Sequence, residues 1–463
     1  MLDNSFNDKS YYKTILAIAI PISIQSLFQA SLSVIDQLMV GQLGENAIAA
    51  VGLGSRFPFI FITTLGAIAT TASIFSSQFW GKKDTRSIGH AFGGTLVLGM
   101  VITIIFSLIS LAFPKQILAL YSRDEKIIEM GGSYLRIIAI SYIPLLLTAI
   151  FSAILRSTEH VKVPMYAGLL SIVLNTSLNF ALIFGSFGFP RLGLYGTAYA
   201  TVIARFVECI LILSVTYGKK YVGAFKVNEF IFIPRELVRK ILIVCVPLVL
   251  NEFMWSLGET MYSIVYGRMG TFEVASMTLT YPIQGLSIGL FTGLSSAAGI
   301  MVGNKLGVGD TELAFKYSKK LIKIGIVGSI LFGGLLSIFS NLYVSVFNIN
   351  NNLKSCTANL LIIFSIVLWI KVSNMIIGSG ILRSGGKTHY TLFLDMFGTW
   401  CIGVPVGFLS AFIFKLSIEW VYFIICGEEL VRFIIGLKLL YSKKWMKSLT
   451  NVTDEHGTSE VFD

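Results

Sequence analysis

Four polar residues share one face of an otherwise apolar segment between Pro21 and Gly44. They follow one another at steps of four, four and three, the spacing of one helix face: Gln25, Gln29, Ser33 and Asp36. A carboxylate within a membrane helix costs roughly 2.5–3.5 kcal/mol at mid-depth. We therefore expect Asp36 to transport or couple an ion, with a structural hydrogen bond to another helix as the alternative.

A second stripe combines two carboxylates with three aromatic rings at steps of three, four, three and four: Glu252, Trp255, Glu259, Tyr262 and Tyr266. Carboxylates supply negative charge and aromatic faces attract cations, so this stripe suits a flat organic cation. Packing of the aromatic rings alone is the alternative interpretation. We assign four further residues to the substrate-binding surface: Gln25, Gln29, Lys371 and Asp395.

Several charged residues in apolar segments need partners, because an isolated charge is costly there. We predict that Lys371 pairs with Glu252, Glu259 or Asp395; alternatively, it is a moving charge that competes with a cationic substrate. Two structural pairs are predicted from a spacing of three residues on one helix: Arg205 with Glu208, and Glu429 with Arg432.

Amide and hydroxyl groups in two neighbouring segments could complete an ion site. Asn175 and Asn179 lie one helical turn apart, and Thr197 follows in the next segment. Carboxylate, amide and hydroxyl oxygens are ligands that a small hard cation prefers. Asp36 together with these three residues would make a Na⁺ site, whereas Asp36 acting as a proton carrier is the alternative.

The composition indicates an integral membrane protein that positions these residues on membrane helices. Of its 463 residues, 54% are hydrophobic and 13% are charged, against about 25% charged in soluble domains. Twelve apolar segments are long enough to cross a bilayer. Their approximate limits are 14–39, 47–76, 89–113, 130–155, 163–186, 193–217, 239–266, 273–302, 321–347, 357–381, 389–413 and 418–441.

The basic residues predict the orientation of these spans. Most Lys and Arg residues outside the spans fall in alternate connections, including the loop near 218–238. This bias predicts that both termini are cytoplasmic, in a multi-pass protein of the cell membrane. It also accounts for the net charge of +11 without a nucleic-acid partner.

The second half of the chain repeats the first. Gln78, Gly81, Asp84 and Thr85 recur 226 residues later as Asn304, Gly307, Asp310 and Thr311, and ILRS at 154–157 recurs at 381–384. The repeat predicts an all-α fold of two six-helix lobes suited to alternating access. We place the lobes at 1–236 and 237–447, followed by a polar cytoplasmic tail at 448–463.

Several segments together make the chain resemble the multidrug and toxic compound extrusion (MATE) transporters over its full length. They are VIDQLMVGQLG at 34–44, LNTSLNFALIFG at 174–185, the two ILRS sequences, and LRSGGKT and LFLDMFGTWCIGVPVGF within 382–408. The resemblance implies two six-helix bundles around a central cavity. It also implies export of lipophilic, mostly cationic compounds in exchange for Na⁺ or H⁺.

The same resemblance implies roles for individual residues. Asp36 looks like the first-lobe acid that the family uses for cation coupling, and Asn175, Asn179 and Thr197 match positions that complete the site in some members. The position of Asn179 is an Asp in other members, which leaves the site charge open. Family members that couple transport to an ion through the second lobe carry a Glu at the place of Trp255 and an Asp at that of Val372, and this chain departs from them at both positions. Glu252 and Glu259 flank Trp255 on the same face as possible replacements.

These observations predict a monomeric, cation-coupled antiporter with no cofactor besides the coupling ion, acting on small organic cations in the lipid bilayer. The chain contains no HExxH, Walker A or GxGxxG sequence, so we do not expect an enzyme. Two alternatives remain: a flippase for lipid-linked precursors, which would need a cationic cavity, and a non-transporting membrane receptor. Efflux and ligand-binding assays distinguish them.

Overall fold

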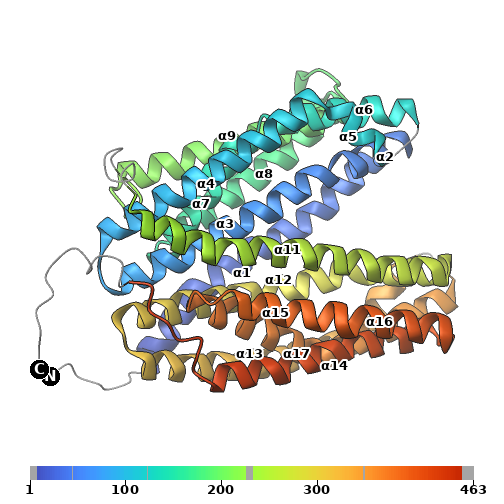
Figure 1. The fold of residues 1–463 in the computed structure, drawn as a ribbon. Helices are drawn as coiled ribbons and strands as arrows, with labels where there is room; N and C mark the ends of the chain where they lie inside the picture. The colour runs from blue at the N-terminus through green and yellow to red at the C-terminus, as the bar shows by residue number, and fades with distance from the viewer. Residues whose placement is uncertain (1–7, 44, 122–123, 226–232, 348–349, 451–463) are drawn as a thin grey trace, which may run out of the picture. The chain divides into compact units, whose positions relative to one another are not determined.

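The structure of the chain is a computed structural model, and all the regular secondary structure among the residues that it describes is helical (Figure 1). These are residues 8–43, 45–121, 124–225, 233–347 and 350–450. Within these ranges the side chains of residues 8–10, 32–38, 41, 45, 46, 48 and 271 lie outside the description. The predicted all-α membrane fold is confirmed.

The first half of the chain forms long helices joined by short connections. In chain order these are α1 (Asp8–Gly41), α2 (Glu45–Gly54), α3 (Arg56–Gly81), α4 (Thr85–Ala112), α5 (Pro114–Ala119), α6 (Glu125–Ala139), α7 (Tyr142–Ser157), α8 (Lys162–Phe184), the 3₁₀ turn η1 (Ser186–Gly188) and α9 (Leu194–Gly218).

The second half has the same helical character but contains three π-helical segments, which often mark functional sites. Its elements are α11 (Arg235–Met269), α12 (Thr271–Val308), α13 (Thr311–Ser345), α14 (Asn351–Met375), η2 (Ile376–Leu382), α15 (His389–Met396), η3 (Phe397–Gly403), α16 (Val404–Phe408), η4 (Leu409–Ile413) and α17 (Ile418–Tyr441). The π-helical segments are η2, η3 and η4.

The helices account for the twelve predicted spans. Among the described residues, ten helices are long and apolar enough to cross a membrane, and α6 with α7, bent by 48°, makes an eleventh. The twelfth is α17, whose bounds match the predicted span but which carries Glu428, Glu429 and Arg432 in its interior. Many helices run past the predicted apolar limits, because their polar ends continue the same backbone hydrogen bonding.

Corresponding helices in the two halves begin in the same way. The carboxylate of Asp84 accepts a hydrogen bond from the Ser87 N–H at 3.0 Å, and that of Asp310 accepts one from the Leu313 N–H at 3.0 Å. Each aspartate caps the first turn of its helix, α4 or α13, and so satisfies an otherwise unpaired N–H. The 226-residue repeat is therefore visible in local structure as well as in sequence.

Contacts within the chain group it into two compact units, residues 27–245 and residues 1–26 together with 246–463. The start of α1 belongs to the second unit. The Ser23 hydroxyl donates to the Leu290 carbonyl at 2.5 Å, and the Tyr11 hydroxyl donates to the Tyr317 carbonyl at 3.1 Å. The lobe limits predicted from the repeat, 1–236 and 237–447, stay a prediction. In the predicted tail, Leu449 is buried, and 451–463 lie outside the description.

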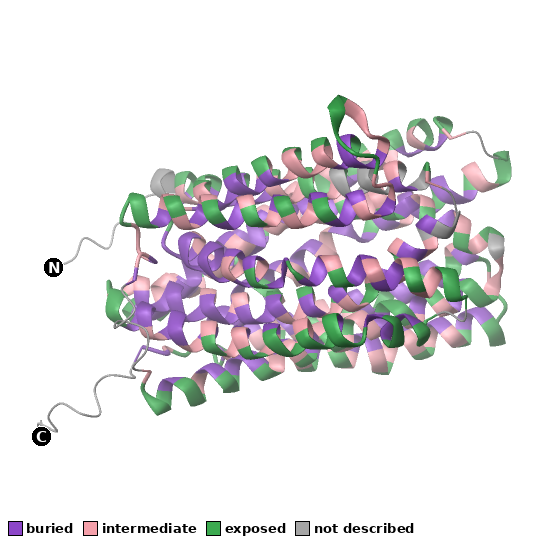
Figure 2. Ribbon diagram, turned by 90° about the horizontal axis from the view of Figure 1, so that it is seen from above, coloured by how far each residue is buried: buried purple, intermediate pink, exposed green. Residues whose placement is uncertain are grey.

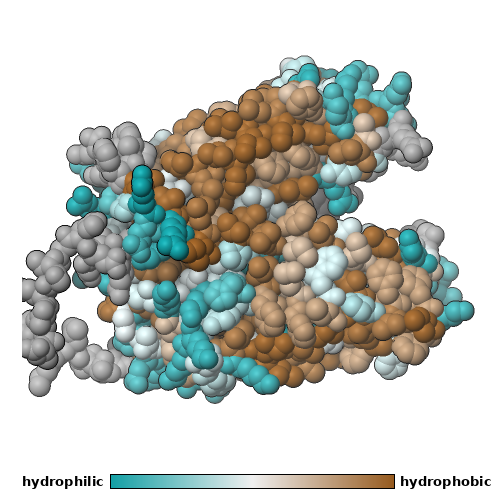
Figure 3. All heavy atoms as spheres, viewed as in Figure 1, coloured by the Kyte–Doolittle hydropathy of each residue, from teal (hydrophilic) through white to brown (hydrophobic). Residues whose placement is uncertain are grey.

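Exposed apolar side chains cover the outer faces of many helices, as expected where lipid rather than water is the surrounding medium. Figure 2 shows buried and exposed residues alternating along individual helices, and Figure 3 shows hydrophobic side chains over much of the visible surface. On α13, Leu331 is 66% exposed and Ile338 is 73% exposed. Such faces are unfavourable in water and favourable in a bilayer.

Candidate functional site

The predicted stripe on α11 faces a cavity inside the second unit. Glu252, Trp255 and Glu259 line a cavity of about 540 Å³, whose other walls come from α12, α14, η2, α15 and α17. Farther along the same stripe, Tyr262 and Tyr266 line an adjoining pocket of about 80 Å³. The helical spacing of three and four residues therefore brings the stripe to these two adjoining pockets, which share lining residues and together are called the hollow.

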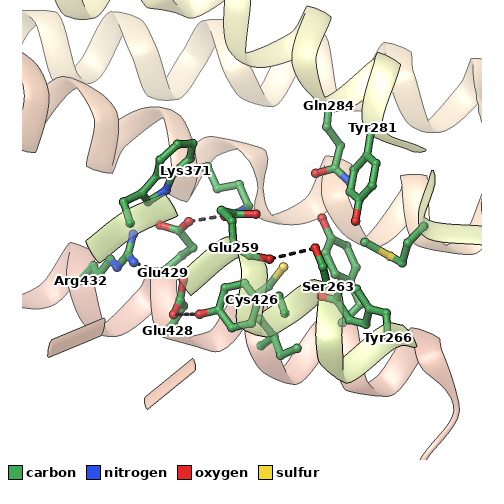
Figure 4. Close-up of a pocket in the computed structure, with 15 residues that line it drawn as sticks. Glu259, Ser263, Tyr266, Tyr281, Gln284, Lys371, Cys426, Glu428, Glu429 and Arg432 are labelled. Carbon is green, nitrogen blue, oxygen red and sulfur yellow. Dashed lines mark hydrogen bonds and ion pairs between the residues drawn. The ribbon is translucent and has the colours of Figure 1, made fainter. Parts of the chain in front are cut away.

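The smaller pocket is rich in aromatic rings (Figure 4). Tyr281 from α12 and Tyr422 from α17 join Tyr262 and Tyr266 in its wall, and Glu259 belongs to both pockets. In Figure 4, Glu259 lies between two groups of residues: Lys371 and Glu429 on one side, and Tyr266 and Tyr281 on the other. A cation here would meet the carboxylate of Glu259, which has no basic partner among the described residues, and several ring faces.

Lys371 forms an ion pair with Glu429, which corrects the prediction of a partner among Glu252, Glu259 and Asp395. The Lys371 Nζ lies 3.0 Å from Glu429 Oε1, across α14 and α17. The Asn374 amide donates to Glu429 Oε2 at 2.7 Å and to the Glu429 carbonyl at 2.8 Å. Glu429 is thus held by two side chains that lie one helical turn apart on α14.

Arg432 joins two other carboxylates, which corrects the predicted pair with Glu429. Its Nη2 lies 3.4 Å from Glu428 Oε1 and its Nη1 lies 3.6 Å from Asp395 Oδ1. The Tyr262 hydroxyl donates to Glu428 Oε2, and the Asn251 amide donates to Asp395 Oδ2 at 2.9 Å. Because Asp395 comes from α15 and Asn251 from α11, this network ties three helices together.

Glu252 also forms an ion pair, with Arg383, which lies two residues beyond the predicted span 357–381. Arg383 is 8% exposed, and its Nη1 and Nη2 each lie 3.4 Å from Glu252 Oε1. Arg383 follows the π-helical segment η2 and lines the larger cavity. Its burial separates it from the solvated basic residues that indicate orientation.

Glu259 differs from the other four acids of the cavity. Glu252, Asp395, Glu428 and Glu429 each have a Lys or Arg partner, whereas the Glu259 carboxylate forms no ion pair within the described part of the chain. Counted as ionised, the hollow holds five acids and three bases: Glu252, Glu259, Asp395, Glu428, Glu429, Lys371, Arg383 and Arg432. The surplus is negative, so the cavity is suited to a positively charged ligand.

The first unit brings together the predicted amide and hydroxyl residues. Asn179 donates its amide to Asn175 Oδ1 at 3.2 Å, and Asn175 donates to the Thr201 hydroxyl at 3.2 Å. Thr201 in turn donates to the Thr197 carbonyl at 2.9 Å. This cluster between α8 and α9 is neutral, and the Thr197 hydroxyl itself donates to the Leu194 carbonyl at 2.7 Å.

The remaining predicted residues lie on α1. The Asp36 side chain is outside the described residues, as is that of Ser33. Gln25 is half-buried and Gln29 is exposed.

On α9, the predicted pair is confirmed, with Arg205 Nη1 3.0 Å from Glu208 Oε2.

Five residues of these networks were missing from the predicted sites and pairs, among them Asn251, which precedes Glu252 on α11. Glu428 lies four residues before Arg432, and this spacing was an available signal for an ion pair. Thr201 lies four residues after Thr197, one turn along the same face. Asn374 and Arg383 gave no comparable signal, because their partners lie on other helices.

Comparison with known proteins agrees with this architecture. Residues 21–181 and 247–409 both match the sequence pattern of the MatE family. The two matched segments start at the first helix of each half, with the 226-residue offset of the internal repeat. The chain belongs to the MatE family.

Relatives of this MatE chain match it over nearly its whole length. It is 28% identical over 448 residues to the probable multidrug resistance protein YoeA of Bacillus subtilis, with 93% of each chain covered. It is 23% identical over 443 residues to a probable multidrug resistance protein NorM of Thermotoga maritima, covering 94% of this chain and 93% of the relative. A solved MATE structure in a straight conformation is 21% identical and superposes with a TM-score of 0.86, covering 94% and 97% of the two chains. The superposition supports the two-lobe, twelve-helix fold.

Proposed function

We propose that this MatE protein is a multidrug efflux transporter of the cell membrane, with both termini in the cytoplasm, that exports lipophilic organic cations in exchange for Na⁺ or H⁺. Its family membership and the names of its relatives support drug efflux as the general activity. The internal repeat supports alternating access between two lobes.

The observation that supports a cationic substrate is that Glu259 forms no ion pair with a basic residue in the described part of the chain. This carboxylate lines both pockets beside Trp255, while each of the four other acids lies within ion-pair distance of a Lys or Arg. A lipophilic cation entering the hollow would supply the missing counter-charge and bury its rings against the aromatic wall. Lys371 and Asp395 then shape the site through their ion pairs instead of binding the cation directly.

We assign coupling to the first lobe. The cluster of Asn175, Asn179 and Thr197 contributes neutral oxygens, so a charge for Na⁺ or a carrier for H⁺ has to come from Asp36. Binding of the coupling ion in one lobe and of substrate in the other would let each bias the same conformational equilibrium. Gln25 and Gln29, on the same helix as Asp36, would extend the substrate path.

The flippase alternative is less well supported by the cavity. A pyrophosphate group would need unpaired cationic side chains, yet Lys371, Arg383 and Arg432 all contact carboxylates. The surplus of acids would repel a polyanion. A receptor without transport would bind the cation but would not move it against a gradient.

The test is efflux of a fluorescent lipophilic cation from proteoliposomes, driven separately by a Na⁺ gradient and by a pH gradient. Efflux under Na⁺ alone would support a metal site at Asp36, Asn175, Asn179 and Thr197, and efflux under the pH gradient alone would support Asp36 as a proton carrier. We expect Asp36→Asn to abolish driven efflux while the protein still inserts and binds the cation. Driven efflux by this variant at the wild-type rate would refute the assignment of Asp36.

A further inference from the structure

The outward face of α13 changes from apolar to basic near its N-terminal end. Val327, Leu331 and Ile338 are between 50% and 73% exposed and lie on one face of the helix. The same three- and four-residue spacing continues toward the start of the helix through Lys316, Lys319 and Lys323, all exposed. Lys323 precedes Val327 by one turn, about 6 Å along the helix axis.

A second segment brings more lysines to the same place. After α17, the chain turns back and is held by Trp445, which is fully buried and donates its indole N–H to the Leu440 carbonyl at 3.0 Å. The ring of Tyr441 meets that of Phe315 on α13, with centroids 5.7 Å apart. Lys443 and Lys444 are therefore displayed beside α13, where both are exposed.

One aromatic ring joins the two basic segments. The Nζ of Lys319 lies 4.9 Å from the centre of the Phe315 ring, and the Nζ of Lys443 lies 5.0 Å from it. Cation–π attraction offsets part of the repulsion between the two ammonium groups. Among the described residues, α13 begins with two acids: Asp310 caps the helix through the Leu313 N–H, and Glu312 is exposed in the first turn.

This basic cluster is not a general property of the repeat. At the 226-residue offset, Lys316, Lys319 and Lys323 correspond to His90, Gly93 and Val97 on α4. The helix α4 begins with the same aspartate cap and has a comparable exposed apolar face farther along. The fold and the insertion of the helix therefore do not require lysines at these positions.

We propose that Lys316, Lys319 and Lys323 of α13, with Lys443 and Lys444, bind the phosphate headgroup of an anionic phospholipid whose acyl chains lie along the apolar face of α13. Lysines at the end of a membrane helix extend their ammonium groups to the headgroup level, and basic clusters there attract anionic lipids. The apolar stripe directly beyond Lys323 gives the lipid tail a surface that a soluble phosphate would not use. The site lies outside the cavity and is independent of the proposed transport function.

The experiment measures lipid binding to the purified full-length protein in neutral detergent, by native mass spectrometry and by thermal stabilisation. Phosphatidylglycerol and phosphatidylcholine with identical acyl chains are compared, and glycerol 3-phosphate provides the headgroup without the tail. We expect retention of phosphatidylglycerol and a rise in melting temperature with it, because a ligand that binds only the folded protein stabilises it. Equal effects of both lipids, or of glycerol 3-phosphate at equal concentration, would overturn the proposal.

Variants identify the site. The triple variant Lys316→Gln, Lys319→Gln, Lys443→Gln should bind phosphatidylglycerol on the order of 100-fold more weakly, from about fivefold for each lysine near the membrane surface. Replacing the same three lysines by arginine retains the charge and should leave binding close to wild type, which separates loss of charge from misfolding.

The matched control removes three exposed lysines of the first unit and should bind like wild type: Lys82→Gln, Lys162→Gln, Lys219→Gln. Wild-type binding by the glutamine triple, or equal loss in the control, would refute the site.

Discussion

Removing one member of the pair between Lys371 and Glu429 should destabilise the protein far more than removing both. The Lys371 Nζ lies 3.0 Å from Glu429 Oε1, and the two side chains are only 24% and 10% exposed. At that distance the attraction is roughly 5 kcal/mol at an effective dielectric constant of 20, before the cost of desolvation is subtracted. Loss of one partner from a buried pair costs about 3–5 kcal/mol, because the other charge is left uncompensated.

For Lys371→Met we expect a loss of about 3 kcal/mol, the lower end of that range, since Asn374 still donates two hydrogen bonds to Glu429. The double variant Lys371→Met, Glu429→Gln should recover most of this loss, because no buried charge of the pair remains. The assay is denaturant unfolding of the purified protein in detergent, analysed as a double-mutant cycle.

The exposed pair of Lys115 and Glu129 is the matched control. Its atoms are 3.5 Å apart and its side chains are 62% and 70% exposed, so Lys115→Met should change stability by about 0–1 kcal/mol. The reasoning is refuted if Lys371→Met is as well tolerated as Lys115→Met. It is also refuted if the double variant is no more stable than Lys371→Met alone.

Two further outcomes follow from the geometry of the hollow. In Gly403→Ala the new Cβ would clash with the Tyr262 hydroxyl and the Glu428 carboxylate, so thermal unfolding in detergent should show a loss of stability of about 2–4 kcal/mol. Gly427→Ala on α17, where a Cβ meets open space, should show no loss of stability. Equal losses in the two variants would contradict the assigned packing. In Trp255→Ala the loss of one aromatic face should raise the apparent KM for a lipophilic cation by about 3- to 30-fold at unchanged expression, and an unchanged KM would remove Trp255 from the binding surface.

Much of the fold could be predicted from the sequence because its signals are local or periodic. Apolar segments of spanning length indicate membrane helices, and the nearly constant offset of 226 to 227 residues indicates two related halves. The spacing that groups Glu252, Trp255 and Glu259 on one helix face also predicts which side of α11 lines the cavity. The break at Ser55, between α2 and α3, falls inside one predicted span, although Gly54 and Ser55 form a pair of the kind at which helices kink.

The ion-pair partners that lie on different helices could not be predicted, because they depend on how distant helices pack. Lys371 and Glu429 lie 58 residues apart on α14 and α17, and Arg383 lies 131 residues from Glu252. Sequence spacing can suggest partners only on the same helix, and for Arg432 it suggested Glu429. In the structure, Arg432 pairs with Glu428 on its own helix and with Asp395 on α15. The assignment of these charges to substrate or to structure therefore requires the three-dimensional arrangement.

The most direct test of the central claim is equilibrium binding of a fluorescent lipophilic cation to purified wild-type protein and to Glu259→Gln. We predict that the substitution weakens binding by about tenfold or more, or at least about 1.4 kcal/mol, because Glu259 is the acid of the hollow without a basic partner among the described residues. The control Glu236→Gln removes an exposed acid from the same helix and should bind like wild type. Wild-type affinity in Glu259→Gln would contradict the account, because the cation would then bind without the charge on which the proposed site depends.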